Sequence, residues 1–115
     1  MPRFVILAHD WPFPHWDLML EAGEVLNTWR LLEEPEPGRT INAQAVADHR
    51  VLYLDYEGPV SGGRGVVTQW DAGEFEWTGG TGNQRYLTLN GARLSGPVQI
   101  LNSKPGRTSV SFGGV

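Results

Sequence analysis

The sequence contains no cysteine, which excludes a disulfide framework, a thiolate metal site and a cysteine nucleophile. A chain without cysteine suits a reducing compartment, and we expect a cytoplasmic protein. The chain also lacks any apolar run near the roughly 20 residues that span a bilayer. Its opening run, Phe4–Ala8, is too short for the core of a signal peptide. We therefore expect a soluble protein with no membrane association.

Positive charge is scarce, with eight arginines and a single lysine, Lys104, against 13 acidic residues. The net charge of −4 argues against broad, non-specific binding to nucleic acid, so any contact with phosphates has to be local. The length of 115 residues predicts one domain, residues 1–115, which we expect to be a monomer.

Fifteen glycines and eight prolines are scattered along the chain, a pattern typical of short strands joined by tight turns. We expect a mostly β fold with little helix, a small closed or partly open antiparallel barrel of about eight strands. Two hairpins are predicted, one across Ala22-Gly23 and one across Asp71-Ala72-Gly73. The role of residues 104–115 stays open. The expected extended segments are Arg3–Ala8, His15–Glu21, Val25–Leu31, Asn42–Asp48, Val51–Tyr56, Val66–Trp70, Glu74–Trp77, Arg85–Leu89, Val98–Asn102 and Ser109–Phe112.

Two of the three histidines form a candidate metal site with a carboxylate. His15 and Asp17 project from the same face of a strand because they are two residues apart. His9 ends the preceding strand, and a loop containing two prolines can return the chain so that His9 faces His15. Two imidazoles and a carboxylate suit Mn²⁺, Zn²⁺ or Fe²⁺. The alternative is that these are ordinary surface or packed side chains.

His49 is the third histidine, and Tyr53 follows it by four residues. His49 is either a loop residue, a further metal ligand or a group that contacts a transferring phosphate. Tyr53 is either a half-buried strand aromatic or a hydroxyl that lines the same pocket.

Several motifs, in order, resemble those of the 3′-phosphoesterase module of bacterial DNA ligase D. The family patterns are HxxxxxHxDFRLE, GVLxSW, EDHPxxYxxFEG and VxVWDxG, and the similarity runs from about Arg3 to about Leu101. The matching motifs are His9-x5-His15-x-Asp17-x3-Glu21, Gly23-Glu24-Val25-Leu26-x2-Trp29, Asp48-His49-x3-Tyr53-x2-Tyr56-Glu57-Gly58 and Trp70-Asp71-x-Gly73.

The resemblance implies a compact β-barrel and a Mn²⁺-dependent enzyme that removes a 3′-terminal ribonucleoside and then a 3′-phosphate. It implies that His9, His15 and Asp17 are the metal ligands, with His49 facing the phosphate and Tyr53 supporting it. The implied partners are nucleic-acid 3′ ends, as in a primer–template, and a separate repair ligase or polymerase.

This chain departs from the family where the family carries cations. Met19, Glu33 and Ile41 stand where an arginine, a lysine and an arginine are expected. Each lost charge-assisted phosphate contact costs on the order of 1.5–3 kcal/mol, so phosphate binding needs replacements. The arginines considered as replacements are Arg30, Arg39, Arg50 and Arg64.

Three functions remain open on the sequence alone. The first is a metal-dependent phosphoesterase acting on nucleic-acid 3′ ends in DNA repair. The second is a non-catalytic metal- or nucleic-acid-binding protein on the same barrel, which Met19 and Glu33 favour. The third is a non-haem Fe²⁺ oxygenase with His15, Asp17 and His49 as its ligands.

Overall fold

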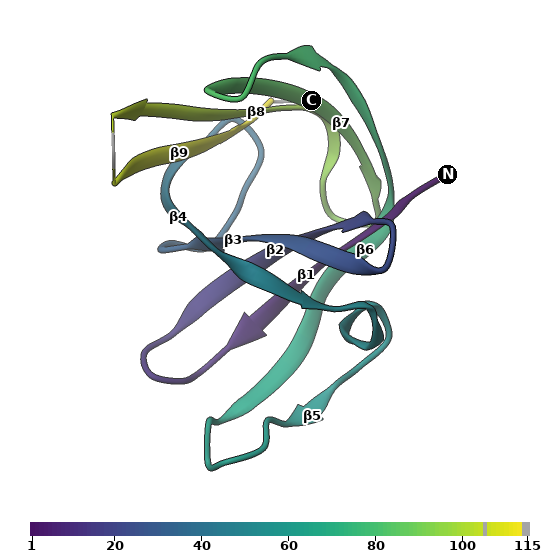
Figure 1. The fold of residues 1–115 in the computed structure, drawn as a ribbon, viewed down its shortest axis with the longest axis vertical. Coiled ribbons are helices and arrows are strands. Elements are labelled where there is room, and N and C mark those ends of the chain that lie inside the picture. The colour runs from purple at the N-terminus through teal and green to yellow at the C-terminus, as the bar shows by residue number, and fades with distance from the viewer. Residues whose placement is uncertain (105, 114–115) are drawn as a thin grey trace.

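Nine β-strands and one 3₁₀ turn account for most of the computed structural model, which describes residues 1–104 and 106–113 (Figure 1). The 3₁₀ turn, η1, spans Val51–Leu54, and the described residues form no α-helix. The strands are β1 (Arg3–His9), β2 (His15–Ala22), β3 (Val25–Leu31), β4 (Thr40–Arg50), β5 (Gly58–Pro59), β6 (Val66–Gly80), β7 (Gln84–Gly91), β8 (Ser95–Lys104) and β9 (Arg107–Phe112).

Eight of these strands close into a barrel. They pair antiparallel in the order β1-β2-β3-β4-β9-β8-β7-β6, and β6 pairs back to β1. The two-residue strand β5 adds to the start of β6. The structure thus confirms the predicted mostly β antiparallel barrel and shows that, of the closed and partly open forms expected, it takes the closed one. No helix among the described residues is long and apolar enough to cross a membrane.

Apolar side chains cover both faces of β1 and β2. Side chains alternate along a strand, so Phe4 and Ile6 point into the barrel, whereas Val5 and Leu7 point outward. The interior cluster draws residues from strands all around the barrel. The second group, which we call the outer cluster, lies beneath η1 and the segment that follows it. Its buried members are Val5, Leu7, Met19, Leu26, Leu54 and Val67.

The segment 51–56 is not a strand, contrary to the sequence prediction. Strand β4 ends at Arg50, which pairs with Val25, the first residue of β3. The chain beyond Arg50 therefore has no further strand edge to follow. It turns instead as η1, and Leu54 packs into the outer cluster with 2% of its surface exposed. The apolar, β-prone composition of 51–56 reflects burial against the barrel.

The predicted hairpin across Asp71-Ala72-Gly73 is also wrong, because β6 runs without interruption from Val66 to Gly80. Its hairpin partner is β7. Asp71 carries a buried carboxylate that accepts backbone hydrogen bonds from the β7–β8 turn. The sequence Asp-Ala-Gly therefore marks a buried acceptor within a long strand. The open question about the C-terminal segment is answered by β9, although residues 105, 114 and 115 lie outside the described residues.

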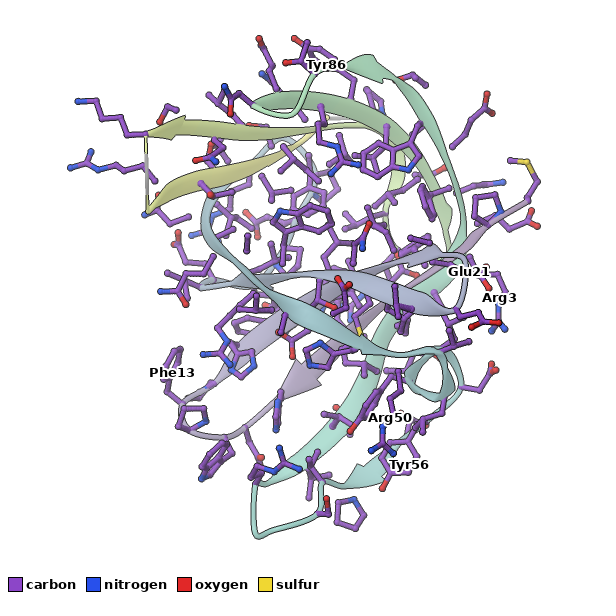
Figure 2. The ribbon with its side chains drawn as sticks, viewed as in Figure 1. Arg3, Phe13, Glu21, Arg50, Tyr56 and Tyr86 are labelled. Atoms are coloured by element: carbon purple, nitrogen blue, oxygen red, sulfur yellow. The ribbon has the colours of Figure 1, made fainter. Side chains whose placement is uncertain are left out.

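An exposed ion pair joins the start of β1 to the residue after η1. Arg3 Nη2 donates to Asp55 Oδ1 over 2.6 Å, and this hydrogen bond holds the pKa of the Asp55 carboxyl below its ordinary value. Arg3 lies beside Glu21 at the end of the β1–β2 pair away from the β1–β2 loop, which carries Phe13 (Figure 2). Asp55 is thus a carboxylate remote from the candidate site described next.

Candidate metal centre

The three predicted metal ligands lie where β1 ends and β2 begins, on the outer face of the barrel. His9 ends β1, His15 begins β2, and the antiparallel register pairs these two residues directly. Asp17 lies two residues beyond His15, so its side chain leaves β2 on the same face. The outward alternation of Val5 and Leu7 continues to His9. The strand register therefore brings the three side chains together, as the spacing predicted.

The polar atoms of these side chains converge on a small volume. His15 Nε2 lies 3.2 Å from Asp17 Oδ2, and His9 Nδ1 lies 3.8 Å from the same oxygen. One ligand atom from each residue lies within 4.8 Å of the other two. The side chain of His15 is fully buried and that of Asp17 is 5% exposed, whereas His9 retains 14%. The cluster is accessible from the His9 side.

Backbone carbonyls fix the orientation of both imidazole rings. His9 Nε2 lies 2.8 Å from the carbonyl oxygen of Arg64, and His15 Nδ1 lies 2.9 Å from that of Phe13. A carbonyl oxygen can only accept, so each of these nitrogens carries the hydrogen and donates it. In a neutral ring the other nitrogen then carries a lone pair. Both of these lone-pair nitrogens are the ones nearest Asp17.

This arrangement fits a divalent metal ion. Zinc, for example, binds imidazole nitrogen and carboxylate oxygen at about 2.0–2.2 Å, which places two ligand atoms of one ion roughly 3–4.4 Å apart. The measured separations of 3.2 and 3.8 Å fall in that range. Metal-bound histidines usually donate their other N–H to a carbonyl or carboxylate, as His9 and His15 do here. Three ligands also leave positions open for water or substrate.

A cavity of about 180 Å³ opens beside this cluster, and the other two predicted site residues line it. The Nδ1 of His49 donates a hydrogen bond to the carbonyl oxygen of Ala47 over 3.0 Å. Its ring packs edge-on against that of Tyr53, with the two ring centres 5.8 Å apart. His15 is not among the residues that line this cavity. The lining residues are His9, Trp11, Asp17, Met19, Arg30, His49, Tyr53, Val60, Arg64 and Val67.

Among the described residues, the one group with metal-ligand spacing contains His9, not His49. The oxygenase hypothesis, which required His49 beside His15 and Asp17, therefore loses the ligand set that it needed. His49 instead lies at the wall of the cavity, where the phosphoesterase hypothesis places it.

Two arginines reach the cavity, although the expected cationic positions are lost. Met19 lines the cavity with an uncharged side chain, and Ile41 is buried in the barrel interior. Glu33 forms an ion pair with Arg39 over 2.5 Å, which removes both of these charges from the site. Of the arginines considered as replacements, the ones that line the cavity are Arg30 and Arg64.

Sequence reasoning missed the backbone groups that complete the site. The backbone carbonyls of Phe13 and Arg64 orient the histidines. The identities of these two residues do not predict this role. Gly65 has a role that also depends on residues far along the chain. Its close approach to Trp11 brings the 61–65 turn against the 10–14 loop, and that approach positions the Arg64 carbonyl.

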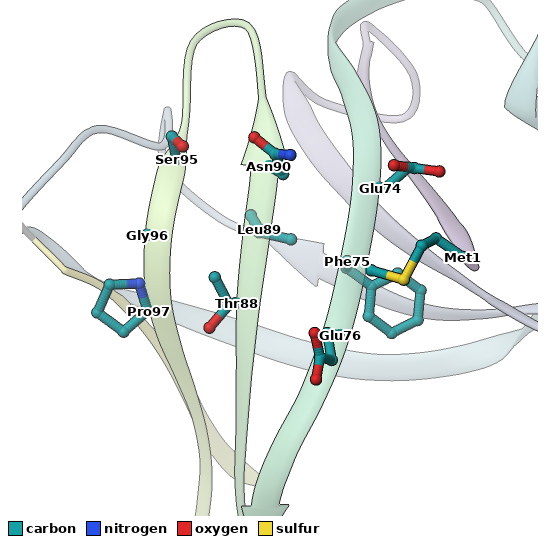
Figure 3. Close-up of a pocket in the computed structure, with 10 residues that line it drawn as sticks. All are labelled: Met1, Glu74, Phe75, Glu76, Thr88, Leu89, Asn90, Ser95, Gly96 and Pro97. Atoms are coloured by element: carbon teal, nitrogen blue, oxygen red, sulfur yellow. The ribbon is translucent and has the colours of Figure 1, made fainter.

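A larger cavity of about 430 Å³ lies elsewhere, on strands β6, β7 and β8 (Figure 3). Its lining includes Glu74, Glu76 and Asn90 but no histidine and no cationic side chain. Two carboxylates without a cation would repel a phosphate. The candidate site is therefore the cavity beside the histidines, where metal-ligating and cationic side chains lie together.

Comparison with known proteins identifies the family. Residues 7–102 match the DNA ligase D 3′-phosphoesterase domain, and the chain belongs to this family. It is 30% identical over 114 residues to the multifunctional non-homologous end joining DNA repair protein LigD of Mycobacterium tuberculosis. It is 31% identical over 113 residues to the multifunctional non-homologous end joining protein LigD of Pseudomonas aeruginosa. These alignments cover 90% and 88% of this chain but only 15% and 13% of those two proteins.

Proposed function

We propose that this chain is a metal-dependent phosphoesterase that heals nucleic-acid 3′ ends in DNA repair. His9, His15 and Asp17 would hold one divalent cation, with Mn²⁺ as the first candidate and Zn²⁺ or another divalent ion as alternatives. The observation that carries the proposal is the convergence of two carbonyl-oriented imidazoles on one carboxylate oxygen at the edge of a cavity. Three acceptors this close together need a cation between them, either a metal ion or a proton on a histidine.

The reaction is hydrolysis of a phosphoester. For a 3′-phosphate, the oxygen of water bonds to phosphorus, the bond from phosphorus to the 3′ oxygen breaks, and that oxygen gains a proton. The products are a 3′-hydroxyl and inorganic phosphate. For a terminal ribonucleoside, hydrolysis releases the nucleoside and leaves a 3′-phosphate. The bound cation would supply positive charge against the phosphoryl oxygens as the transition state forms.

His49 and Tyr53 act from the part of the cavity wall that β4 and η1 supply. The Nδ1–H of His49 is committed to the carbonyl of Ala47, so its Nε2 is the nitrogen that meets a substrate. In the imidazolium form Nε2–H donates to a phosphoryl oxygen and can pass its proton to the departing oxygen. The edge contact with Tyr53 limits rotation of the His49 ring.

The test is incubation with Mn²⁺ and an end-labelled primer–template that carries either a 3′-phosphate or one 3′-terminal ribonucleotide. We expect wild-type protein to remove both groups. Asp17→Asn and His15→Ala should lose this activity while they keep the barrel by circular dichroism. Asp55→Asn is the matched control, because it removes an exposed carboxylate far from the cavity. Absence of product from folded wild-type protein that binds Mn²⁺ would refute the proposal.

A non-catalytic binding protein is the second candidate, and Met19 favours it because an uncharged side chain occupies the cavity where the family carries arginine. Such a protein would bind metal or nucleic-acid ends without turnover under any of these conditions. The relatives are named as multifunctional end-joining proteins, and the matched region is a small part of each. We therefore also propose that a repair ligase or polymerase uses the ends that this chain produces.

A further inference from the structure

Arg30 occupies a position from which it can meet a phosphate beside the metal ligands. It lies on β3 and pairs directly with Asp17 across the β2–β3 register. Directly paired residues project from the same face, so Arg30 leaves the barrel on the side of the cavity, which it lines. Its guanidinium carbon lies 5.6 Å from the centre of the Phe13 ring.

The guanidinium of Arg30 has unused hydrogen-bonding capacity. Its Nε is buried and has no hydrogen-bond partner in the part of the chain that the structure describes. A buried donor without a partner is costly, and native structures usually satisfy such a group with protein, water or ligand. Arg30 also forms no ion pair with any described carboxylate, although Asp17 is its cross-strand neighbour.

The other arginines near the site are already engaged. Arg64 donates from Nε and Nη2 to the carbonyl and hydroxyl oxygens of Ser61. Arg39 is paired with Glu33 and does not line the cavity. Arg30 is therefore the arginine whose position and unused donor both point to a ligand of the cavity.

We propose that Arg30 is the phosphate-binding cation of this site and replaces the arginine that the family carries at the position of Met19. This inference rests on the proposed function, because it takes the ligand to be the phosphate at a nucleic-acid 3′ end. Met19 is the next outward-facing residue of β2 after Asp17, so the cation has moved to the neighbouring strand while it still serves the same cavity. The flat guanidinium fork matches two phosphate oxygens, which makes Arg30 selective for a phosphorylated end.

The test compares the binding of two labelled oligonucleotide duplexes, one with a 3′-phosphate and one with a 3′-hydroxyl, in EDTA so that no turnover occurs. Wild-type protein should prefer the phosphorylated end. Arg30→Met should lose about 10- to 100-fold of that preference, the equivalent of one charge-assisted contact, and Arg30→Lys should lose less. The matched control is Arg39→Met, which removes one arginine outside the cavity and should keep the wild-type preference.

A second experiment moves the positive charge from β3 back to β2. Restoring the cation on β2, with Met19→Arg in the Arg30→Met background, should recover part of the preference. A purely structural Arg30 that balances the charge of Asp17 predicts the opposite pattern. Its removal would then alter Mn²⁺ affinity and leave the preference for the phosphorylated end unchanged.

Each outcome bears on the inference separately from the proposed function. An unchanged preference in folded Arg30→Met or Arg30→Lys, or equal binding of both ends by wild-type protein, overturns the role of Arg30. Wild-type protein that prefers the phosphorylated end but fails to hydrolyse it with Mn²⁺ refutes the phosphoesterase and leaves the phosphate-binding role standing. If hydrolysis does occur, Arg30→Met should chiefly raise KM.

Discussion

The buried carboxylate of Asp71 leads to a sharp prediction about stability. Its Oδ1 accepts the backbone N–H groups of Ala72, Ala92 and Arg93 over 2.9, 2.9 and 3.1 Å, and its Oδ2 accepts that of Leu94 over 2.8 Å. Three of these donors belong to the turn that joins β7 to β8. One side chain on β6 therefore holds a turn more than twenty residues away.

The magnitude follows from what Asp71→Ala would leave behind. The N–H of Leu94 is buried and would lose its partner, at a cost of about 1–3 kcal/mol. Ala92 and Arg93 are exposed, so water can replace their bonds, and we assign each about 0.5–1 kcal/mol. The expected loss is about 2–5 kcal/mol in the free energy of unfolding, a large share of the 5–15 kcal/mol typical of a domain. Asp71→Asn keeps one acceptor oxygen and should lose about half as much.

The measurement is urea unfolding followed by tryptophan fluorescence, with Asp55→Asn as the control because that carboxylate is exposed and bonded to a single side chain. The urea midpoint should fall in the Asp71 variants without a change in slope. Mn²⁺ affinity of the folded fraction should stay unchanged, since Asp71 does not line the cavity beside the histidines. A loss below about 1 kcal/mol in Asp71→Ala would refute the reasoning.

Three further predictions concern the site and its support. In Gly65→Ala the new Cβ would overlap the carboxylate of Asp10, so the Arg64 carbonyl that orients His9 would shift. Calorimetry should then show a Mn²⁺ affinity about 10- to 100-fold lower than that of wild-type protein. An unchanged affinity would contradict this prediction. Leu54→Ala should lower the free energy of unfolding by about 2–3 kcal/mol, because Leu54 is buried in the outer cluster. A loss below about 1 kcal/mol, measured by urea unfolding, would mean that η1 packs loosely. Mn²⁺ at about 100 times its Kd should raise the free energy of unfolding of wild-type protein by about 2.7 kcal/mol, and Asp17→Asn should abolish this increase. An equal increase in both proteins would mean that the metal binds elsewhere.

The strands and the barrel were largely predictable because their signals are local. The expected strand Val25–Leu31 coincides with β3, and the glycine turns separate most of the other strands where they were expected. Spacing also sufficed to place His15 and Asp17 on one face. These predictions need only the two-residue period of a strand and the position of a turn.

The errors arose where a distant contact decides the local structure. Asp71-Ala72-Gly73 has the composition of a turn, but the partners of Asp71 lie in the β7–β8 turn, which a local reading cannot reach. Residues 51–56 have the composition of a strand, but no strand edge remains to pair with them. The roles of the Phe13 and Arg64 carbonyls could not be predicted for a further reason. Every residue has a backbone carbonyl, and only the fold decides where that carbonyl points.

The proposed roles of His9, His15 and Arg30 place different demands on the fold. Short, rigid side chains meet a metal only where the register places them, and His9 and His15 face each other as a direct cross-strand pair. A guanidinium sits at the end of a long chain, so the same cavity can be reached from β2 at position 19 or from β3 at Arg30. In the proposed site, strand register therefore fixes the metal ligands, whereas the phosphate-binding cation can come from either strand.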